Sequence, residues 1–171
     1  MILRMRDATY VSRGNIVAPP TSFDIDAGER VAHHAANPLE AEAVAMLAAA
    51  LVRPSGGTVL IGEYDPRVQP VHCKRLAGFV PHDPLPLREM GFDRFIDYRA
   101  ALWDIDREHA RDEAERILAE LRSLHEAFAF PIVGALIAAP RLLVLDRPQP
   151  STREAIYAVA GATAILETLV G

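Results

Sequence analysis

The pattern of apolar and polar positions predicts a β-rich beginning to the chain. Short β-prone or alternating segments occupy residues 2–5, 8–12, 21–25, 30–34 and 58–61. Gly14 and Asn15 supply a turn signal after the second of these segments. The first third of the chain is therefore predicted to consist mostly of strands.

One helix inside this part has clear sequence boundaries. Asn37 is a good N-cap, Pro38 suits the first helical position, and Glu40 follows three residues after the cap. Apolar residues then recur at helical spacing, at positions 44, 47, 48 and 51. We expect a helix that starts at Pro38 and ends before the Pro-Ser-Gly-Gly sequence at residues 54–57.

The middle of the chain alternates between strand and helix patterns. A short strand is expected at residues 77–80, and residues 84–124 are helical in pattern, with one helix closing near Trp103. Residues 142–146 form a continuous apolar run that ends in an aspartate. Such a run is typical of a strand buried on both faces of a parallel sheet.

Two further helices are expected around that buried strand. Residues 127–138 are apolar on most sides and predict a buried helix if Pro131 lies in its first turn. Ser151 is expected to cap a short helix, with Glu154 completing a capping box. Residues 162–170 fit either a last strand or more helix.

Composition limits the classes of function. The 171 residues and 18.7 kDa fit one compact domain, and half of the residues are apolar, as in an ordinary folded protein. The formal net charge is -5, with acidic and basic residues interspersed. A sequence-independent nucleic-acid binder needs a basic surface, so nucleic acid is excluded as an expected partner.

The compartment is expected to be the cytoplasm. Cys73 is the only cysteine, which rules out an internal disulfide and fits a reducing environment. The first residues lack the apolar stretch of a signal peptide, and the apolar runs are shorter than the ~20 residues that span a bilayer. Association with the inner face of the plasma membrane through a partner is compatible with this expectation.

Four sequence segments carry a resemblance to a known family. They are residues 27–32 (AGERVA), 53–62 (RPSGGTVLIG), 78–83 (GFVPHD) and 140–148 (PRLLVLDRP). In this order the chain resembles the nucleotide-binding subunits of ABC transporters. The resemblance covers nearly the whole chain and implies a single α/β domain, residues 1–171, with the P-loop NTPase type of ABC ATPase fold. It also implies an N-terminal antiparallel β subdomain, a helical subdomain at about residues 84–126, and an end before the family's usual C-terminal helices.

The segment that matches the family's phosphate-binding Walker A loop lacks the residues that such a loop uses. In that loop, glycines let backbone N–H groups wrap the phosphates, a lysine reaches the β- and γ-phosphates, and a hydroxyl holds Mg²⁺. Residues 35–43 read AANPLEAEA instead. Pro38 fills one glycine position, Ala41 replaces the lysine and Glu42 replaces the hydroxyl.

These replacements also oppose phosphate binding directly. Asn37 caps the expected helix, and Glu40 and Glu42 place carboxylates near the N–H groups that would otherwise attract phosphate. One repulsion between like charges at about 4 Å is worth roughly 4 kcal/mol at an effective dielectric near 20, and less where water screens it. We therefore expect no bound nucleotide cofactor.

Other positions that match the family's catalytic motifs have changed as well. Asp146 remains at the Walker B position, but Arg147 stands where the family has its general-base glutamate. His82 replaces the glutamine of the Q-loop, and the signature motif falls near residues 122–126, which keep its serine and neither glycine. Because an ABC site combines the Walker A loop of one subunit with the signature of another, this chain is expected to complete neither half. It therefore resembles an inactive member of the family.

Several single residues have two interpretations. Tyr10 stands where the family stacks an aromatic ring on adenine, but an aromatic residue early in a β segment more often packs in the core. The histidines at positions 33, 34, 72 and 82 match no familiar ligand spacing, so no metal site is expected. Cys73 is most simply a small packing residue.

The helical segment offers a candidate partner surface. In the family, the region between Q-loop and signature receives a helix of the membrane protein. Apolar and aromatic candidates for such a groove are Met90, Phe92, Phe95, Tyr98 and Trp103. The competing interpretation is that these side chains fill the core of the helical subdomain.

The leading hypothesis is a pseudo-ATPase: a non-catalytic cytoplasmic subunit that binds a membrane-embedded transporter subunit or another ABC subunit. It includes association with copies of itself or with a different subunit. Two alternatives remain open. One is a weak or partner-activated ATPase that uses Tyr10 and Asp146. The other is a free-standing ligand sensor that uses the vacated nucleotide pocket.

Overall fold

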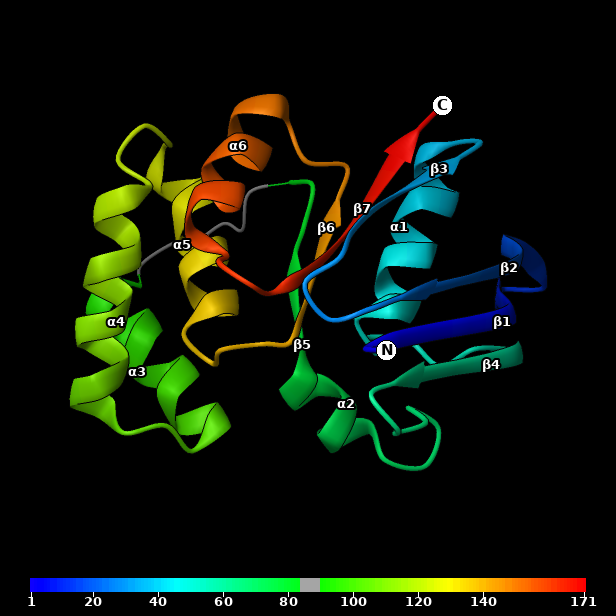
Figure 1. Ribbon diagram of the computed structural model, residues 1–171, viewed down its shortest axis with the longest axis horizontal. Helices are drawn as coiled ribbons and strands as arrows, with labels where there is room; N and C mark the ends of the chain where they lie inside the picture. Colours follow the sequence, from blue (N-terminus) through cyan, green and yellow to red (C-terminus); the bar gives the residue numbers. More distant parts are fainter. Residues whose placement is uncertain (84–89) are drawn as a thin grey trace.

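The computed structural model describes residues 1–83 and 90–171, and it contains two sheets with helices between and around them (Figure 1). An antiparallel sheet has the order β2-β1-β4, and a parallel sheet has the order β3-β7-β6-β5. The strands are β1 (Leu3–Ser12), β2 (Asn15–Ile25), β3 (Arg30–Ala35), β4 (Gly56–Ile61), β5 (Ala77–Val80), β6 (Leu142–Asp146) and β7 (Ala164–Val170). The helices are α1 (Pro38–Ala48), α2 (Pro70–Leu76), α3 (Phe92–Trp103), α4 (Arg107–Glu120), α5 (Glu126–Leu136) and α6 (Pro150–Val159). The predicted mixed α/β fold with an N-terminal antiparallel part is confirmed.

The antiparallel sheet is built from longer strands than the sequence predicts. The two expected segments at residues 2–5 and 8–12 form one strand, β1, which is irregular around Asp7, a residue with a φ of 46°. The turn is confirmed: Ser12 pairs with Asn15, and both intervening residues have positive φ, as a two-residue hairpin requires. β2 also continues through two prolines, which an edge strand tolerates because its outer N–H groups need no partner strand.

The parallel sheet separates two apolar cores. All five residues of β6 are buried, as the apolar run predicts. Alternate residues of β6 point to opposite faces: Leu142 and Val144 pack in a core with α1 and the antiparallel sheet, whereas Leu143 and Leu145 pack in a core with α3 to α6. Helix α1 therefore lies between the two sheets, which fixes the position of its first turn at the end of β3 (Figure 1).

Helices α3 and α4 form the helical part of the fold. Asp104, with a φ of 54°, ends α3 as expected near Trp103. Asp97 on α3 binds two residues of α4, with Arg107 Nη2 at 2.5 Å and Arg111 Nη2 at 2.7 Å from its Oδ2 atom. Expected helix between residues 84 and 89 lies outside the described residues.

Two expectations about helices are wrong, and one helix was not predicted. Pro131 lies inside α5 rather than in its first turn, because the helix begins at Glu126 and the proline follows five residues later. Ser151 does not cap α6: the cap position is Gln149, and Pro150 takes the first helical position, where its missing N–H is harmless. Helix α2, seven residues long, has no strong sequence signal.

The last segment is a strand rather than a helix. β7 pairs with β3 on one side and β6 on the other, so it is central to the parallel sheet. Its Glu167 is buried beneath α6, where the Tyr157 hydroxyl donates a hydrogen bond to it. Burial raises the pKa of the Glu167 carboxyl, although Arg153, 3.7 Å away, acts in the opposite direction.

Candidate functional site at the end of the parallel sheet

Parallel strands end at the same edge of a sheet, and this edge collects most of the predicted site residues. β3 ends at Ala35 just before α1, β6 ends at Asp146, and β5 ends two residues before His82. Thr168, near the end of β7, pairs with Asp146 in the sheet. The topology therefore brings the start of α1, Asp146 and His82 to the same edge of the parallel sheet.

The first turn of α1 is closed by its own residues. Asn37 Oδ1 accepts a hydrogen bond from the backbone N–H of Glu40 at 3.0 Å, which confirms the predicted N-cap. The carbonyl oxygen of Asn37 accepts from the N–H of Ala41 at 3.1 Å, and Pro38 has no N–H to offer. Ala41 itself is fully buried. A lysine at this position would therefore start from a fully buried Cβ atom.

Arg147 forms a two-pronged ion pair with the neighbouring Asp146. Its Nε atom lies 2.8 Å from Oδ1 and its Nη2 atom 2.9 Å from Oδ2. The side chains are 19% and 4% exposed, so water screens the pair weakly. The hydrogen bonds that Arg147 donates to the Asp146 carboxylate raise the pKa of the guanidinium against the effect of burial, and the charges of Glu42 and Asp83 act in the same direction as these bonds. Arg147 therefore lies among three carboxylates, those of Asp146, Glu42 and Asp83.

The backbone of Arg147 is also held in place. Its φ of 45° is in the left-handed region, which is uncommon for a residue other than glycine. Its N–H donates to the carbonyl oxygen of Thr168 at 2.9 Å, and its own carbonyl lies 2.8 Å from His82 Nδ1. Since a carbonyl only accepts, Nδ1 of His82 must carry the proton. These contacts fix the turn in which Arg147 covers Asp146.

Tyr10 does not belong to this cluster. It lies half-buried on β1, opposite Ala18 of β2, and packs against the core between α1 and the antiparallel sheet. That position supports the packing interpretation of the sequence.

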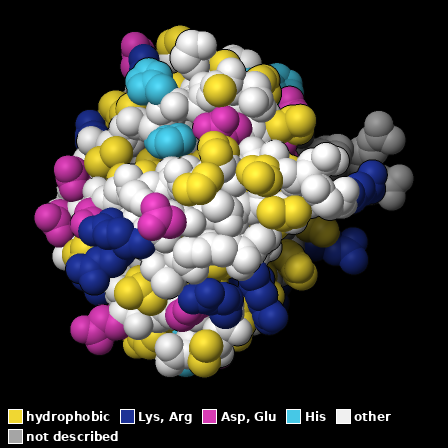
Figure 2. Space-filling model, turned by 90° about the vertical axis from the view of Figure 1, so that its right-hand side faces the viewer, with side chains coloured by type: hydrophobic (Ala, Val, Ile, Leu, Met, Phe, Trp, Pro, Cys, Tyr) yellow, Lys and Arg dark blue, Asp and Glu magenta, His cyan; other side chains and the backbone are white. Residues whose placement is uncertain are grey.

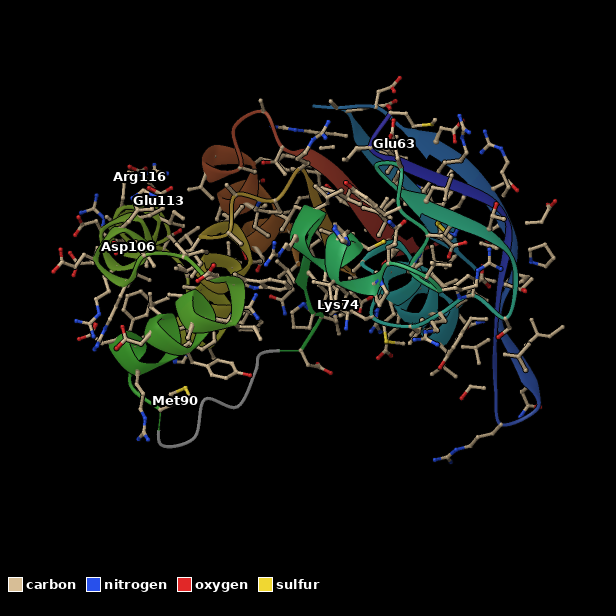
Figure 3. The ribbon with its side chains drawn as sticks, turned by 90° about the horizontal axis from the view of Figure 1, so that it is seen from below. Glu63, Lys74, Met90, Asp106, Glu113 and Arg116 are labelled. Carbon is tan, nitrogen blue, oxygen red and sulfur yellow. The ribbon has the colours of Figure 1, made fainter. Side chains whose placement is uncertain are left out.

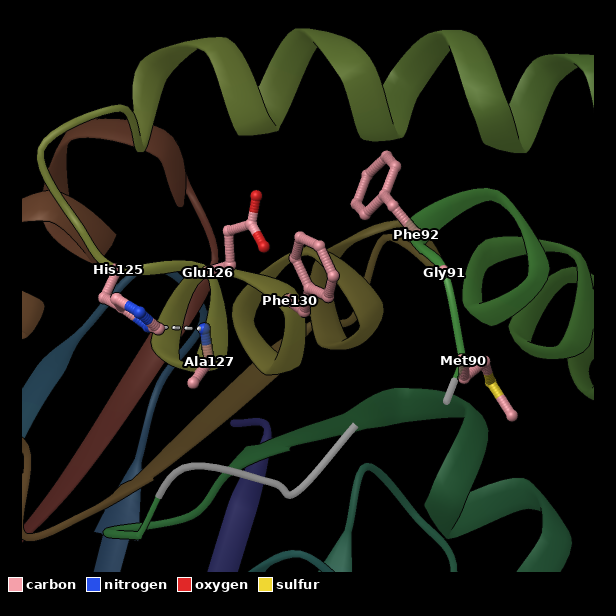
Figure 4. Close-up of a pocket in the computed structure, with 7 residues that line it drawn as sticks. All are labelled: Met90, Gly91, Phe92, His125, Glu126, Ala127 and Phe130. Carbon is pink, nitrogen blue, oxygen red and sulfur yellow. Dashed lines mark hydrogen bonds between the residues drawn. The ribbon is translucent and has the colours of Figure 1, made fainter. Parts of the chain in front are cut away.

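The predicted partner residues do not form one groove. Met90 and Phe92 line an open pocket of about 360 Å³ together with residues from the start of α5 (Figure 4). Phe95 is only 7% exposed and stacks on Phe130 in the core. Tyr98 is exposed on α3, and Trp103, at the far end of the same helix, lines a different pocket with Arg75. Phe95 therefore packs in the core and Tyr98 reaches the surface, and a role of the exposed residues in partner binding stays a prediction.

The start of α5 corresponds to the position of the predicted signature motif. His125 Nδ1 accepts a hydrogen bond from the N–H of Ala127 at 3.2 Å, and Glu126 stands in the first turn. The rings of Phe92 and Phe130 lie 4.8 Å apart, tilted by 49°, at the base of the pocket. Sequence reasoning missed Phe130 because nothing in an apolar helix marks the one residue that faces a pocket.

A third cavity lies beside α1. It has a volume of about 340 Å³ and is lined by residues of β2 and β3 and by Glu40. His33 of β3 stacks on Phe23 of β2, with ring centroids 5.5 Å apart. Burial lowers the pKa of the His33 imidazole, although the charge of Glu40 opposes that shift. Among the residues that the structure describes, no group of three metal-binding side chains occurs.

The comparisons with known proteins concern the fold. No family model matches the sequence, and no curated protein matches it either. Solved structures match over nearly the whole chain: an ATP-binding subunit of an ABC transporter has a TM-score of 0.80 and 19% identity, covering 99% of this chain and 80% of that chain. The fold is that of the ABC transporter ATP-binding subunits.

Two further solved structures of ABC proteins share this fold. The cbiO1 protein from Clostridium perfringens, part of the transporter complex cbiONQ, has a TM-score of 0.74 and 17% identity, covering 99% of this chain and 78% of that chain. A dimeric ATP-binding cassette in a post-hydrolysis state, bound to ADP and Pi, has a TM-score of 0.73 and 16% identity, covering 98% and 88%. At these low identities the similarity establishes the ABC fold only. The function has to be argued from the residues of the site.

Proposed function

We propose that this chain is a non-catalytic ABC-type subunit that binds a membrane transporter component or another ABC subunit. One observation carries the proposal: the Arg147 guanidinium is bound to Asp146 at the edge where an active relative would need a free carboxylate and an open phosphate loop. The chain's own cation and the capped start of α1 occupy this edge, so the site is closed without a ligand.

Electrostatics support the absence of nucleotide binding. A triphosphate at this edge would approach Glu42, Asp83 and Asp146, while the one arginine of the cluster is already paired. Each close like-charge contact is worth up to roughly 4 kcal/mol before screening by water. Displacing Arg147 to release a cation would leave Asp146 buried without a partner, which is a further cost.

The signature side supports the same proposal. His125 occupies the N-cap of α5, and Glu126 adds a carboxylate to its first turn. A phosphate group from a partner subunit would meet that carboxylate instead of open backbone N–H groups. Both half-sites are thus unsuited to phosphate, which argues against a silent but complementing role in an ordinary ATPase pair.

The candidate surface for a partner is the outer side of α3. Tyr98 is 57% exposed and Leu102 is 51% exposed, four residues apart on one helical face. Met90, at the start of this region, is also exposed (Figure 3). No helix within the described residues is long and apolar enough to cross a membrane. A cytoplasmic subunit held at the membrane by a partner, as cbiO1 is part of a transporter complex, fits these features.

The test is a restoration series measured by binding of Mg-ATP. Single variants Arg147→Glu, Glu42→Ser and Ala41→Lys, and the triple variant, are titrated with a fluorescent nucleotide. We expect no binding below 1 mM by the unmodified chain or the single variants, since each leaves other obstacles in place. Micromolar affinity in the unmodified chain that is abolished by Tyr10→Ala would instead establish the weak-ATPase alternative.

A further inference from the structure

A cavity at the opposite edge of the parallel sheet carries charged side chains of both signs. It has a volume of about 310 Å³ and is lined by Met1, Gly62, Glu63, Tyr64, Leu76 and Arg141. Leu76 and Arg141 immediately precede β5 and β6, so the cavity lies at the amino-terminal ends of the parallel strands. Asp146 and Arg147 lie at the carboxyl end of β6. The cavity is therefore separate from the candidate site at the other end of the sheet.

Main-chain hydrogen bonds hold the walls of this cavity in place. The N–H of Gly62 donates to the carbonyl oxygen of Ile2 at 2.7 Å, and the N–H of Arg141 donates to that of Leu76 at 2.9 Å. Gly62 has a φ of 61°, and a Cβ atom there would lie 2.9 Å from Cδ1 of Leu76. Glycine is therefore the residue that lets the turn after β4 approach the end of α2 at the cavity.

The aromatic wall is also held in position. Tyr64 exchanges main-chain hydrogen bonds of 3.0 and 3.2 Å with Ile61, and its carbonyl oxygen accepts from Cys73 Sγ at 3.4 Å. The ring of Tyr64 stacks on His72 of α2, with ring centroids 4.8 Å apart. Because both the backbone and the ring are fixed, a ligand meets a preformed cavity and loses little free energy in ordering it.

Glu63 and Arg141 place charges of opposite sign at the cavity. Glu63 lies in the turn after β4 (Figure 3), and both side chains are exposed. Within residues 1–83 and 90–171, neither of them belongs to an ion pair. The terminal ammonium group of Met1 is already bound to Asp26, 2.9 Å from its Oδ1 atom. The cavity therefore offers one carboxylate and one guanidinium to a ligand.

These groups together match a small zwitterion. A guanidinium binds a carboxylate through two parallel hydrogen bonds, and the carboxylate of Glu63 suits an ammonium group. Met1, Leu76 and the ring of Tyr64 supply apolar surface beside the two charges. A phosphate carries only negative charge and would be repelled by Glu63. The volume lies at the lower end of the roughly 300–1,000 Å³ of small-molecule sites, so the matching ligand is small.

We propose that this cavity binds a free amino acid with an apolar side chain. Arg141 holds the carboxylate of the ligand, and Glu63 holds its ammonium group. The apolar side chain of the ligand packs against Leu76 and Tyr64. This site goes beyond the proposed function and does not depend on it, because the cavity and Arg147 lie at opposite ends of the parallel strands.

The first test compares L-leucine with two probes that each lack one of its charges. Isoamylamine is leucine without the carboxylate, and isocaproate is leucine without the ammonium group. The isotope-labelled full chain is titrated with each compound at neutral pH, and its amide NMR signals are followed. We expect saturable shifts around Gly62 and Arg141 with leucine, and about tenfold lower affinity for each probe, because each loses one charge-assisted contact. No saturable shift with leucine, or equal affinities for all three compounds, would overturn the proposal.

The second test removes the charges of the cavity one at a time. Arg141→Gln should bind leucine no more tightly than isoamylamine, since the carboxylate of leucine then has no cationic partner. Glu63→Gln should bind leucine no more tightly than isocaproate, for the corresponding reason. Both side chains are exposed, and the main-chain hydrogen bond of Arg141 is retained, so both variants are expected to fold.

Two substitutions elsewhere serve as matched controls. Arg94→Gln and Glu115→Gln neutralise the same kinds of charge at exposed positions of α3 and α4. Both controls should keep the preference for leucine over the two probes. A preference that survives in Arg141→Gln and Glu63→Gln, or that disappears equally in the controls, would contradict the proposed contacts.

Discussion

The starts of α1 and α5 lie on opposite sides of the parallel sheet and differ in their surroundings. At α1, Asn37 caps the helix and a paired Arg147 lies among carboxylates, so the surface is charged and satisfied. At α5, His125 caps the helix, but beside it the rings of Phe92 and Phe130 leave an apolar pocket open. The comparison teaches that two helix starts at one edge of a fold can differ in kind: the start of α1 is charged with its polar groups paired, whereas the start of α5 borders an apolar pocket.

Away from these two helix starts, acidic and basic side chains are mixed on the surface. On the face shown in Figure 2, small groups of Lys or Arg side chains lie beside Asp or Glu side chains, and most of the face is uncharged. Arg6 and Asp24, for example, form a pair across β1 and β2.

The largest expected effect concerns the support of the pocket at α5. Phe95→Ala should lower the free energy of unfolding by about 3 kcal/mol, because Phe95 is buried and packs beneath the pocket against Phe130. Tyr98→Ala, on the exposed side of the same helix, is the matched control and should change stability by less than about 0.5 kcal/mol. Urea unfolding followed by circular dichroism measures both. Similar losses for the two variants would mean that core and surface sides of α3 are wrongly assigned.

The next effect concerns the closed half-site. Arg147→Ala should lower the free energy of unfolding by about 2 kcal/mol, between the values for exposed and fully buried pairs, because it leaves the Asp146 carboxylate unpaired. The double variant Arg147→Ala with Asp146→Asn should recover part of this loss. Arg116→Ala removes an exposed pair with Glu113 on α4 (Figure 3) and serves as the control. An Arg147→Ala variant as stable as that control would show that the pair does not hold the site closed.

The cap of α1 is expected to matter less. Asn37→Ala should cost about 1 kcal/mol of stability, because the N–H of Glu40 loses its acceptor. Asn37→Asp keeps an acceptor oxygen and should be nearly neutral. Thermal melting of both variants distinguishes a cap from an ordinary exposed residue, since loss of an uninvolved side chain would leave both melting temperatures unchanged.

The smallest effect is a dependence on pH beside α1. The folded pKa of His33 lies below its ordinary value because of burial, so the unfolded chain binds more protons as the pH falls below about 6.5. The stability contributed by neutral His33 is therefore complete above that pH and decreases as the pH falls toward the folded pKa. Comparing unfolding at pH 5 to 7 for His33→Gln and for the exposed control His34→Gln measures it. A pH dependence unchanged by His33→Gln would assign it to other groups.

The sequence predicts the start of α1, the buried strand β6 and the first hairpin turn, because each of these features depends on residues close together in the chain. Asn37 marks the start of α1 by its own hydrogen bond, and the apolar run of β6 needs both faces buried wherever it lies. Gly14 predicts a turn because glycine readily adopts positive φ, and its φ in the structure is 80°. These features depend on residues close together in the chain.

What the sequence does not predict depends on distant contacts. The pocket needs Phe92 of α3 beside Phe130 of α5, which only tertiary packing brings together. Arg147 is visible as a charge reversal, but its pairing with the adjacent Asp146 depends on a left-handed turn held by β7. Pro131 lies inside α5 although proline disfavours a helix interior, because packing of the surrounding buried residues stabilises the helix.

The most direct test of the central claim is calorimetric titration of the unmodified chain with Mg-ATP, paired with thermal melting at millimolar nucleotide. The account predicts no binding heat and an unchanged melting temperature, because the cation of Arg147 and the capped start of α1 leave no phosphate site. A rise of several degrees, as linkage to a bound ligand produces, together with measurable heat, would contradict it.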